Sequence, residues 1–166
     1  MKRQFVAALC VLASFPLLAA SWLDQASIPN DFLSSRGGIH QAVLALENEP
    51  LHKNAEYVRM LLAGYYKNVD YIICGDVLGP LSKSKKHAAV MWQIIIASGD
   101  WVEANPARAK DIDAYTLAGL ESGVRTYKNL LKIKPRYRHK LLDELLTRYE
   151  GGTLNQWNLE HPCRPI

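Results

Sequence analysis

The chain has 166 residues, of which 49% are hydrophobic, and it carries a formal net charge of +4 at pH 7. This length suits one domain with a single core, and the hydrophobic content is ordinary for a globular protein. Loss of Lys2 and Arg3 with an N-terminal leader would leave a charge of +2, so whole-chain charge gives no argument for nucleic-acid binding.

The first 21 residues have the layout of a secretory signal peptide. Lys2 and Arg3 precede an apolar run over residues 5–20, and small residues occupy positions 19–21. The short basic start is typical of bacterial signals, so we expect the mature chain in the periplasm or outside the cell. The alternative is an uncleaved segment that anchors the chain in the inner membrane, although the run is marginal for a span and contains a proline.

Two cysteines, Cys74 and Cys163, remain once Cys10 is removed with the signal peptide. An even number of cysteines in an exported chain favours a disulfide. A Cys74–Cys163 bridge would close a loop of about 90 residues and would hold the C-terminal tail against the middle of the domain. The alternative is two separate thiols, one of them buried.

Helical periodicity dominates the rest of the chain, and no stretch combines strand alternation with hairpin signals. Residues 22–38 are rich in Ser, Pro, Asn and Gly and are predicted to form an extended leader. Residues 39–166 are predicted to form the helical domain, with helices over 39–48, 54–74, 82–98, 106–134 and 136–150. The predicted fold class is therefore all-α: a single compact bundle of four to five helices with an irregular C-terminal tail held by the disulfide.

Glycine and capping residues set the predicted ends of these helices. Gly75 is expected to break the helix over 54–74, and Gly99 is expected to stop the helix that follows. Asp100 would then begin a short turn, because Glu103 stands three residues later as in a capping box.

The helix predicted over 106–134 is the element around which the bundle is organised. Asn105 can cap its free N–H groups, and Pro106 suits the first helical position. Gly119 and Gly123 lie four residues apart on one face, and a glycine inside a helix costs about 1 kcal/mol relative to alanine. Close packing against a neighbouring helix would offset that cost, and the alternative is a kink at Gly119.

The common sequence motifs for metal binding, haem attachment and the nucleophile elbow of hydrolases are absent from the sequence. The HExxH, paired CxxC, CxxCH and GxSxG patterns do not occur. No two histidines have the spacing that would place two metal ligands on one helix face: His40, His52, His87, His139 and His161. We therefore predict no catalytic residue, no metal site and no cofactor.

Two carboxylates, Glu121 and Asp76, lie near the predicted core. A buried carboxylate with a raised pKa could act as a general acid, as glycan-cleaving enzymes require. Nothing in the sequence positions a catalytic partner for either residue. Glu121 is instead expected to face solvent and to pair with Arg125, four residues later on the helix surface.

Basic residues form two runs that are the best candidates for a binding surface. The first run stands at a predicted helix N-terminus, where positive charge is unfavourable to the helix dipole: Lys83, Lys85 and Lys86. The second run lies at the corner between the last two predicted helices: Lys132, Lys134, Arg136, Arg138 and Lys140. Such runs could meet an acidic protein, lipopolysaccharide or anionic lipid, whereas no nucleic acid is expected outside the cytoplasm. The alternative is a solvated helix corner without a partner.

Export, a helical core, a charged corner and the absence of an assembled site favour an exported, non-enzymatic protein that binds another envelope or exported protein. An inhibitor, an immunity protein or an envelope accessory factor would fit this description. Two alternatives remain: a small envelope hydrolase that uses a carboxylate, and a binder of anionic lipid or lipopolysaccharide through the basic corner.

Overall fold

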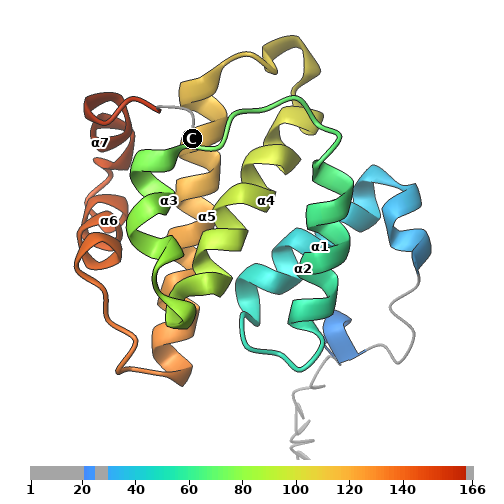
Figure 1. The fold of residues 1–166 in the computed structure, drawn as a ribbon, viewed down its shortest axis with the longest axis horizontal. Coiled ribbons are helices and arrows are strands. Elements are labelled where there is room, and N and C mark those ends of the chain that lie inside the picture. The colour runs from blue at the N-terminus through green and yellow to red at the C-terminus, as the bar shows by residue number, and fades with distance from the viewer. Residues whose placement is uncertain (1–20, 25–29, 164–166) are drawn as a thin grey trace, which may run out of the picture.

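Helix α4, Ala88–Ala104, runs through the middle of the protein beside the longest helix, α5, Ile112–Ile133 (Figure 1). The computed structural model describes residues 21–24 and 30–163, without the side chains of Asn30, Asp76 and Val77. The predicted signal peptide lies outside the described residues, apart from Ser21. Within the described part, the chain forms seven α-helices and four short 3-10 helices, with no strand. The predicted all-α bundle is confirmed, with more helices than expected.

Five further helices surround the α4–α5 pair. The helices α1 and α2 lie on one side of α4, and α3, α6 and α7 lie on the other (Figure 1). Their bounds in chain order are α1 Arg36–Asn48, α2 Ala55–Tyr66, α3 Gly75–Ser82, α6 Lys140–Glu150 and α7 Leu154–Glu160.

The hydrophobic core has two parts, and α4 contributes to both. Ile96 and Ala97 pack with α1 and α2, whereas Val90 and Ile94 pack with α3, α5, α6 and α7. A helix that is apolar around its circumference must be covered on more than one side. This pattern explains why α4, rather than the longer α5, is the central helix.

The most extensive helix contact among the described residues is between α4 and α5, and Gly119 and Gly123 lie in it. A Cβ atom on Gly119 would lie 2.7 Å from the carbonyl oxygen of Ile94 and closer still to the hydroxyl of Ser98. A Cβ atom on Gly123 would collide with the Ile94 side chain. The prediction of close packing at these glycines is confirmed, and α5 continues unbroken through both.

The segment 22–38, predicted as an extended leader, contains the 3-10 helices Trp22–Asp24 and Asn30–Ser34. Leu23 is fully buried and Phe32 nearly so, and both belong to the core part beneath α1 and α2. The hydroxyl of Ser35 accepts the N–H of Gly38 and caps α1. Because of this cap, α1 begins three residues before the predicted start at 39.

The prediction of one helix over 54–74 is wrong for the second half of that range. α2 ends at Tyr66, and α3 begins at Gly75, where a break was predicted. Between the two helices, the hydroxyl of Tyr115 on α5 accepts the N–H of Ile72 at 3.1 Å. A tertiary contact, which periodicity cannot show, therefore replaces the helical hydrogen bond of that residue.

The predicted helix end at Gly99 is also wrong, because α4 continues to Ala104. The ring of Tyr66 packs directly on Gly99, and a Cβ atom there would lie 2.6 Å from Tyr66 Cδ1. This glycine marks a close approach between α2 and α4. Asp100 and Glu103 consequently lie inside α4 and do not begin a capping box.

The long helix starts later than predicted, after the 3-10 helix Pro106–Arg108. Asn105 does not cap it, because its side-chain amide donates to the carbonyl oxygen of Trp101 at the end of α4. Asp111 is the cap, and its carboxylate accepts the N–H of Ala114 at 3.1 Å.

The C-terminal tail was predicted to be irregular, but it contains the helix α7. Leu154 and Trp157 of α7 are buried, and the indole N–H of Trp157 donates to Glu144 on α6 at 3.0 Å. Beyond α7, Cys163 forms the predicted disulfide with Cys74.

The helix predicted over 136–150 begins only at Lys140. Among the described helices, none is long and apolar enough to cross a membrane.

Reduction of the disulfide is expected to lower the free energy of unfolding by about 4–5 kcal/mol, because Cys74 and Cys163 are 89 residues apart and the bridge restricts the unfolded chain. Urea unfolding followed by circular dichroism, with and without reductant, measures this difference. The double variant Cys74→Ser/Cys163→Ser is the control and should not respond to reductant. Equal stability of the oxidised and reduced wild-type chain would contradict the expectation.

Gly119→Ala is expected to destabilise the fold by about 1–3 kcal/mol, because overpacking at the α4–α5 contact outweighs the better helix propensity of alanine. Gly64→Ala in α2 is the matched control, since a Cβ atom there meets nothing within 4 Å. This control should stabilise the protein by about 0.5–1 kcal/mol. Urea midpoints of both variants give the comparison, and a neutral or stabilising Gly119→Ala would contradict the close contact.

Candidate functional site

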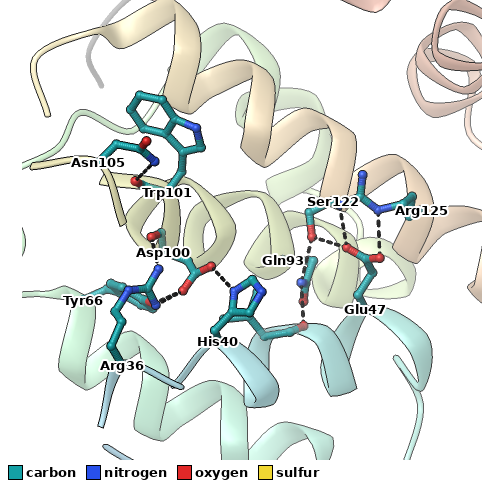
Figure 2. Close-up of polar contacts among 11 residues, drawn as sticks. Arg36, His40, Glu47, Tyr66, Gln93, Asp100, Trp101, Asn105, Ser122 and Arg125 are labelled. Atoms are coloured by element: carbon teal, nitrogen blue, oxygen red, sulfur yellow. Dashed lines mark hydrogen bonds and ion pairs between the residues drawn. The ribbon is translucent and has the colours of Figure 1, made fainter. Parts of the chain in front are cut away.

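A polar groove of about 230 Å³ runs between α1, α4 and α5. Each helix contributes one stripe of residues to it, and Figure 2 shows its polar contacts. Charged residues mark its two ends, and small or apolar side chains lie between them. The lining residues of the groove are Arg36, His40, Val43, Leu44 and Glu47 from α1, Ala97, Asp100, Trp101 and Ala104 from α4, and Ala118, Glu121, Ser122 and Arg125 from α5.

Helical periodicity explains why these residues share one groove. On α1, positions 36, 40, 43 and 47 follow one another at steps of three or four residues, as do 40, 44 and 47, so all five lie on one face of the helix. The same spacing places Asp100 one turn from Ala97 and Ala104, and Glu121 one turn from Ala118 and Arg125. The groove is the line along which these three faces meet.

Asp100 organises one end of the groove. Its carboxylate accepts hydrogen bonds from the Arg36 guanidinium, from the Tyr66 hydroxyl at 3.1 Å and from His40 Nδ1 at 2.8 Å (Figure 2). Arg36 also donates to the backbone carbonyl oxygen of Asp100. The Asp100 side chain is only 10% exposed, whereas that of His40 is 52% exposed and reaches the solvent.

The electrostatics of this end follow from burial. Desolvation would lower the pKa of Arg36, but the hydrogen bond and the negative charge of Asp100 outweigh it, so the pKa is raised. Desolvation, followed by the charge of Asp100, raises the pKa of the Tyr66 hydroxyl. The Arg36 guanidinium and the Tyr66 hydroxyl therefore keep their protons, and both donate hydrogen bonds to the Asp100 carboxylate.

Glu47 organises the other end of the groove. Arg125 donates to both of its carboxylate oxygens, at 2.8 and 3.0 Å, and the Ser122 hydroxyl donates at 2.7 Å (Figure 2). The hydrogen bond to Glu47 raises the pKa of Arg125. Gln93 lies behind this pair and donates to Ser122 and to the backbone of Val43, at 2.9 and 3.0 Å, so that it links all three helices.

The carboxylates singled out from the sequence have different positions. Glu121 lines the groove and is 43% exposed, and its carboxylate lies 4.0 Å from Arg125, as predicted. The side chain of Asp76 lies outside the described part of the structure. Glu121 is therefore at the groove surface. Among the carboxylates that the structure describes, the buried ones are Glu47 and Asp100, which were not candidates from the sequence.

Tertiary structure brings together the two basic runs predicted from the sequence. His87, at the end of the first run, contacts the backbone carbonyl oxygen of Tyr137, in the second run, through Nε2 at 2.8 Å. The rings of His87 and His139 lie 4.9 Å apart, and Lys86 Nζ lies 5.8 Å from the centre of the Tyr137 ring. We call the joined region the basic surface: Lys83, Lys85, Lys86, Lys132, Lys134, Arg136, Arg138 and Lys140.

Burial, followed by the neighbouring His87, lowers the pKa of His139. Within residues 21–24 and 30–163, no group of three or more His, Cys, Asp or Glu side chains could hold a metal ion.

Sequence reasoning did not find the polar residues of the groove. Asp100 has the position of a capping residue in the sequence, and Glu47 follows Ala45 and Leu46 with no motif around it. A signal was present, since Arg36, His40 and Glu47 share a helix face with Val43. It could not be used without knowing which helix faces that stripe.

Comparisons with protein-family models, with curated proteins and with solved structures found no match to this chain.

A double-mutant cycle with Glu47→Gln and Arg125→Met is expected to give a coupling energy of about 1–3 kcal/mol, because Glu47 is buried and accepts two hydrogen bonds from the guanidinium. Partial exposure of Arg125 keeps this value below that of a fully buried pair. The matched control is the Lys128–Glu150 pair, which has the same distance of 2.8 Å but side chains that are both 52% exposed. Its coupling should be below about 1 kcal/mol. Equal couplings, measured by urea unfolding, would contradict the role of burial.

Proposed function

We propose that this chain is an exported, non-enzymatic protein that binds another envelope or exported protein, and that the polar groove receives a projecting segment of that partner. The observation that supports this proposal is the bonding of the two buried carboxylates. Asp100 and Glu47 each accept hydrogen bonds from an arginine and from a hydroxyl group. Carboxylates engaged in this way hold the surrounding donors in fixed positions and suit recognition better than proton transfer.

The partly exposed side chains of the groove belong to residue types that are common in protein interfaces. Arg36, Arg125 and Trp101 belong to the residue types that dominate binding energy at interfaces. The two guanidinium groups are already held by carboxylates, so a partner would immobilise them at little further loss of side-chain entropy. Trp101 is likewise held, because the Arg108 guanidinium lies 5.3 Å from the centre of its ring.

The dimensions of the groove favour a protein segment over a small ligand. Its volume of about 230 Å³ is below the roughly 300–1,000 Å³ that small-molecule sites occupy. The stripe on α1 from Arg36 to Glu47 extends over about 16 Å at the helical rise per residue. A shallow groove of this length accepts a few side chains of a larger partner.

The disulfide supports the exported location. Bonds such as Cys74–Cys163 form and persist in oxidising compartments, among them the bacterial periplasm. The N-terminal layout of basic, apolar and small residues agrees with this location. An inhibitor, an immunity protein or an envelope accessory factor therefore remains the best description.

The groove also contains an arrangement that some hydrolases use, a half-exposed histidine, His40, oriented by the carboxylate of Asp100. Two contacts weigh against this alternative. Arg36 shares the carboxylate that would orient His40, and the one hydroxyl nucleophile that lines the groove, Ser122, donates to Glu47 and accepts from Gln93.

Ala118→Arg is expected to abolish capture of the partner from a periplasmic extract, because the long side chain would fill the centre of the groove. Ala104→Arg, at the exposed rim of the groove, should weaken capture in the same way. Asn155→Arg introduces the same side chain on α7, outside the groove, and should leave capture unchanged. Affinity capture with the tagged, disulfide-bonded chain, followed by mass spectrometry, compares the variants. Capture of no specific partner, or equal capture by the groove variants and the wild type, would overturn the proposal.

A further inference from the structure

The basic surface differs from the rest of the protein in its ion pairing. Seventeen Lys and Arg residues lie in the described ranges, and eight of them form this surface. Of these eight, Arg138 alone has an ion-pair partner within the described residues, Asp143. Of the other nine, six are paired: Arg36, Lys53, Arg59, Arg108, Arg125 and Lys128. The unpaired cations are therefore concentrated at one place.

Buried contacts hold the surface together. His87 is 3% exposed and joins the turn after α3 to the connection between α5 and α6. Its Nε2 donates to the carbonyl oxygen of Tyr137 at 2.8 Å, because a carbonyl can only accept, and its Nδ1 is hydrogen-bonded to the Ser84 hydroxyl at 2.8 Å. The peptide N–H of His139 donates to the Tyr127 hydroxyl at 3.0 Å, which fixes the connection to α5. The backbone segments that carry the cations are thus held by hydrogen bonds at the C-terminal end of α5, which is the lower end of the bundle in Figure 1.

An exposed apolar residue lies among these cations. Ile133, the last residue of α5, is 52% exposed and stands between Lys132 and Lys134. A soluble polyanion would need the cations alone. Cations beside an exposed aliphatic residue are a combination that suits the interface of an anionic bilayer, where charges meet phosphates and the apolar group enters the acyl boundary.

We propose that the basic surface docks this protein on an anionic phospholipid bilayer, with its lysines and arginines on the headgroup phosphates and Ile133 inserted at the interface. This docking is independent of the partner proposed for the groove.

Sedimentation with phospholipid vesicles tests the proposal, using the full disulfide-bonded chain. Binding is expected to vesicles that contain phosphatidylglycerol and not to vesicles of phosphatidylcholine alone, and it should weaken steeply as salt is added. Lys134→Glu/Arg136→Glu should weaken binding at least about twentyfold, since each basic residue near an anionic surface contributes roughly a fivefold change in affinity. Lys67→Glu/Lys110→Glu carries the same change in net charge outside the surface and should bind like the wild type.

Ile133→Ser separates a bilayer from other anionic partners. It should weaken vesicle binding several-fold while retention on a heparin column stays unchanged, because heparin offers charge without an apolar phase. All substituted side chains are exposed, and circular dichroism should match that of the wild type. Absence of binding to phosphatidylglycerol vesicles, or equal loss in the Lys67/Lys110 control, would overturn the proposal. Unchanged vesicle binding by Ile133→Ser would overturn the insertion of Ile133 and would show that the surface binds by charge alone, as it would to any polyanion.

Discussion

The close approach of α4 and α5 is the constraint on which the rest of the structure depends. At Gly119 and Gly123 no side chain separates the two helices, so Ile94 and Ser98 contact the backbone of α5 directly. This contact sets the register between the helices and therefore the separation of Asp100 and Trp101 from Glu121 and Ser122 across the groove. α1 closes the groove by bonding to both helices. The two glycines, which carry no chemical group of their own, thereby determine the shape of the candidate site.

The bonds that form the site also hold the bundle together. Gln93 joins α1 and α5 through the backbone of Val43 and the hydroxyl of Ser122, while Arg36 and Arg125 tie opposite ends of α1 to α4 and α5. Burial of a charge is unfavourable unless the charge is paired and hydrogen-bonded. Each buried carboxylate in the groove therefore requires its arginine. For this reason the negative charges of Asp100 and Glu47 are neutralised within the groove, and the guanidinium groups of Arg36 and Arg125 are held in fixed positions.

The groove and the basic surface represent two different uses of charge. Charges in the groove are paired across helices, whereas those of the basic surface are mostly unpaired and screened only by solvent. The two regions are also separate in space, since Arg125 and Ile133 are eight residues apart on α5, or about 12 Å along the helix. A bilayer at the end of α5 would leave the side of the bundle, and with it the groove, open to a partner. An envelope protein that binds another protein near a membrane surface is consistent with both arrangements.

Residue patterns were sufficient to predict the class of fold, the helical character of most segments, the disulfide and the close packing at Gly119 and Gly123. These features depend on local periodicity, on cysteine number and on the energetic cost of glycine in a helix. The predicted helix boundaries at 74, 98 and 106 are wrong. Tertiary contacts of Tyr115 with Ile72 and of Tyr66 with Gly99 outweigh the local signals at the first two, and at the third the Asn105 side chain bonds locally to the carbonyl oxygen of Trp101. The groove and the basic surface could not be predicted from the sequence for a related reason. Asp100 and Glu47 are buried, and the two basic runs form one surface, only because helices that are distant in the chain pack together. A pattern within one helix does not specify which helix will face it.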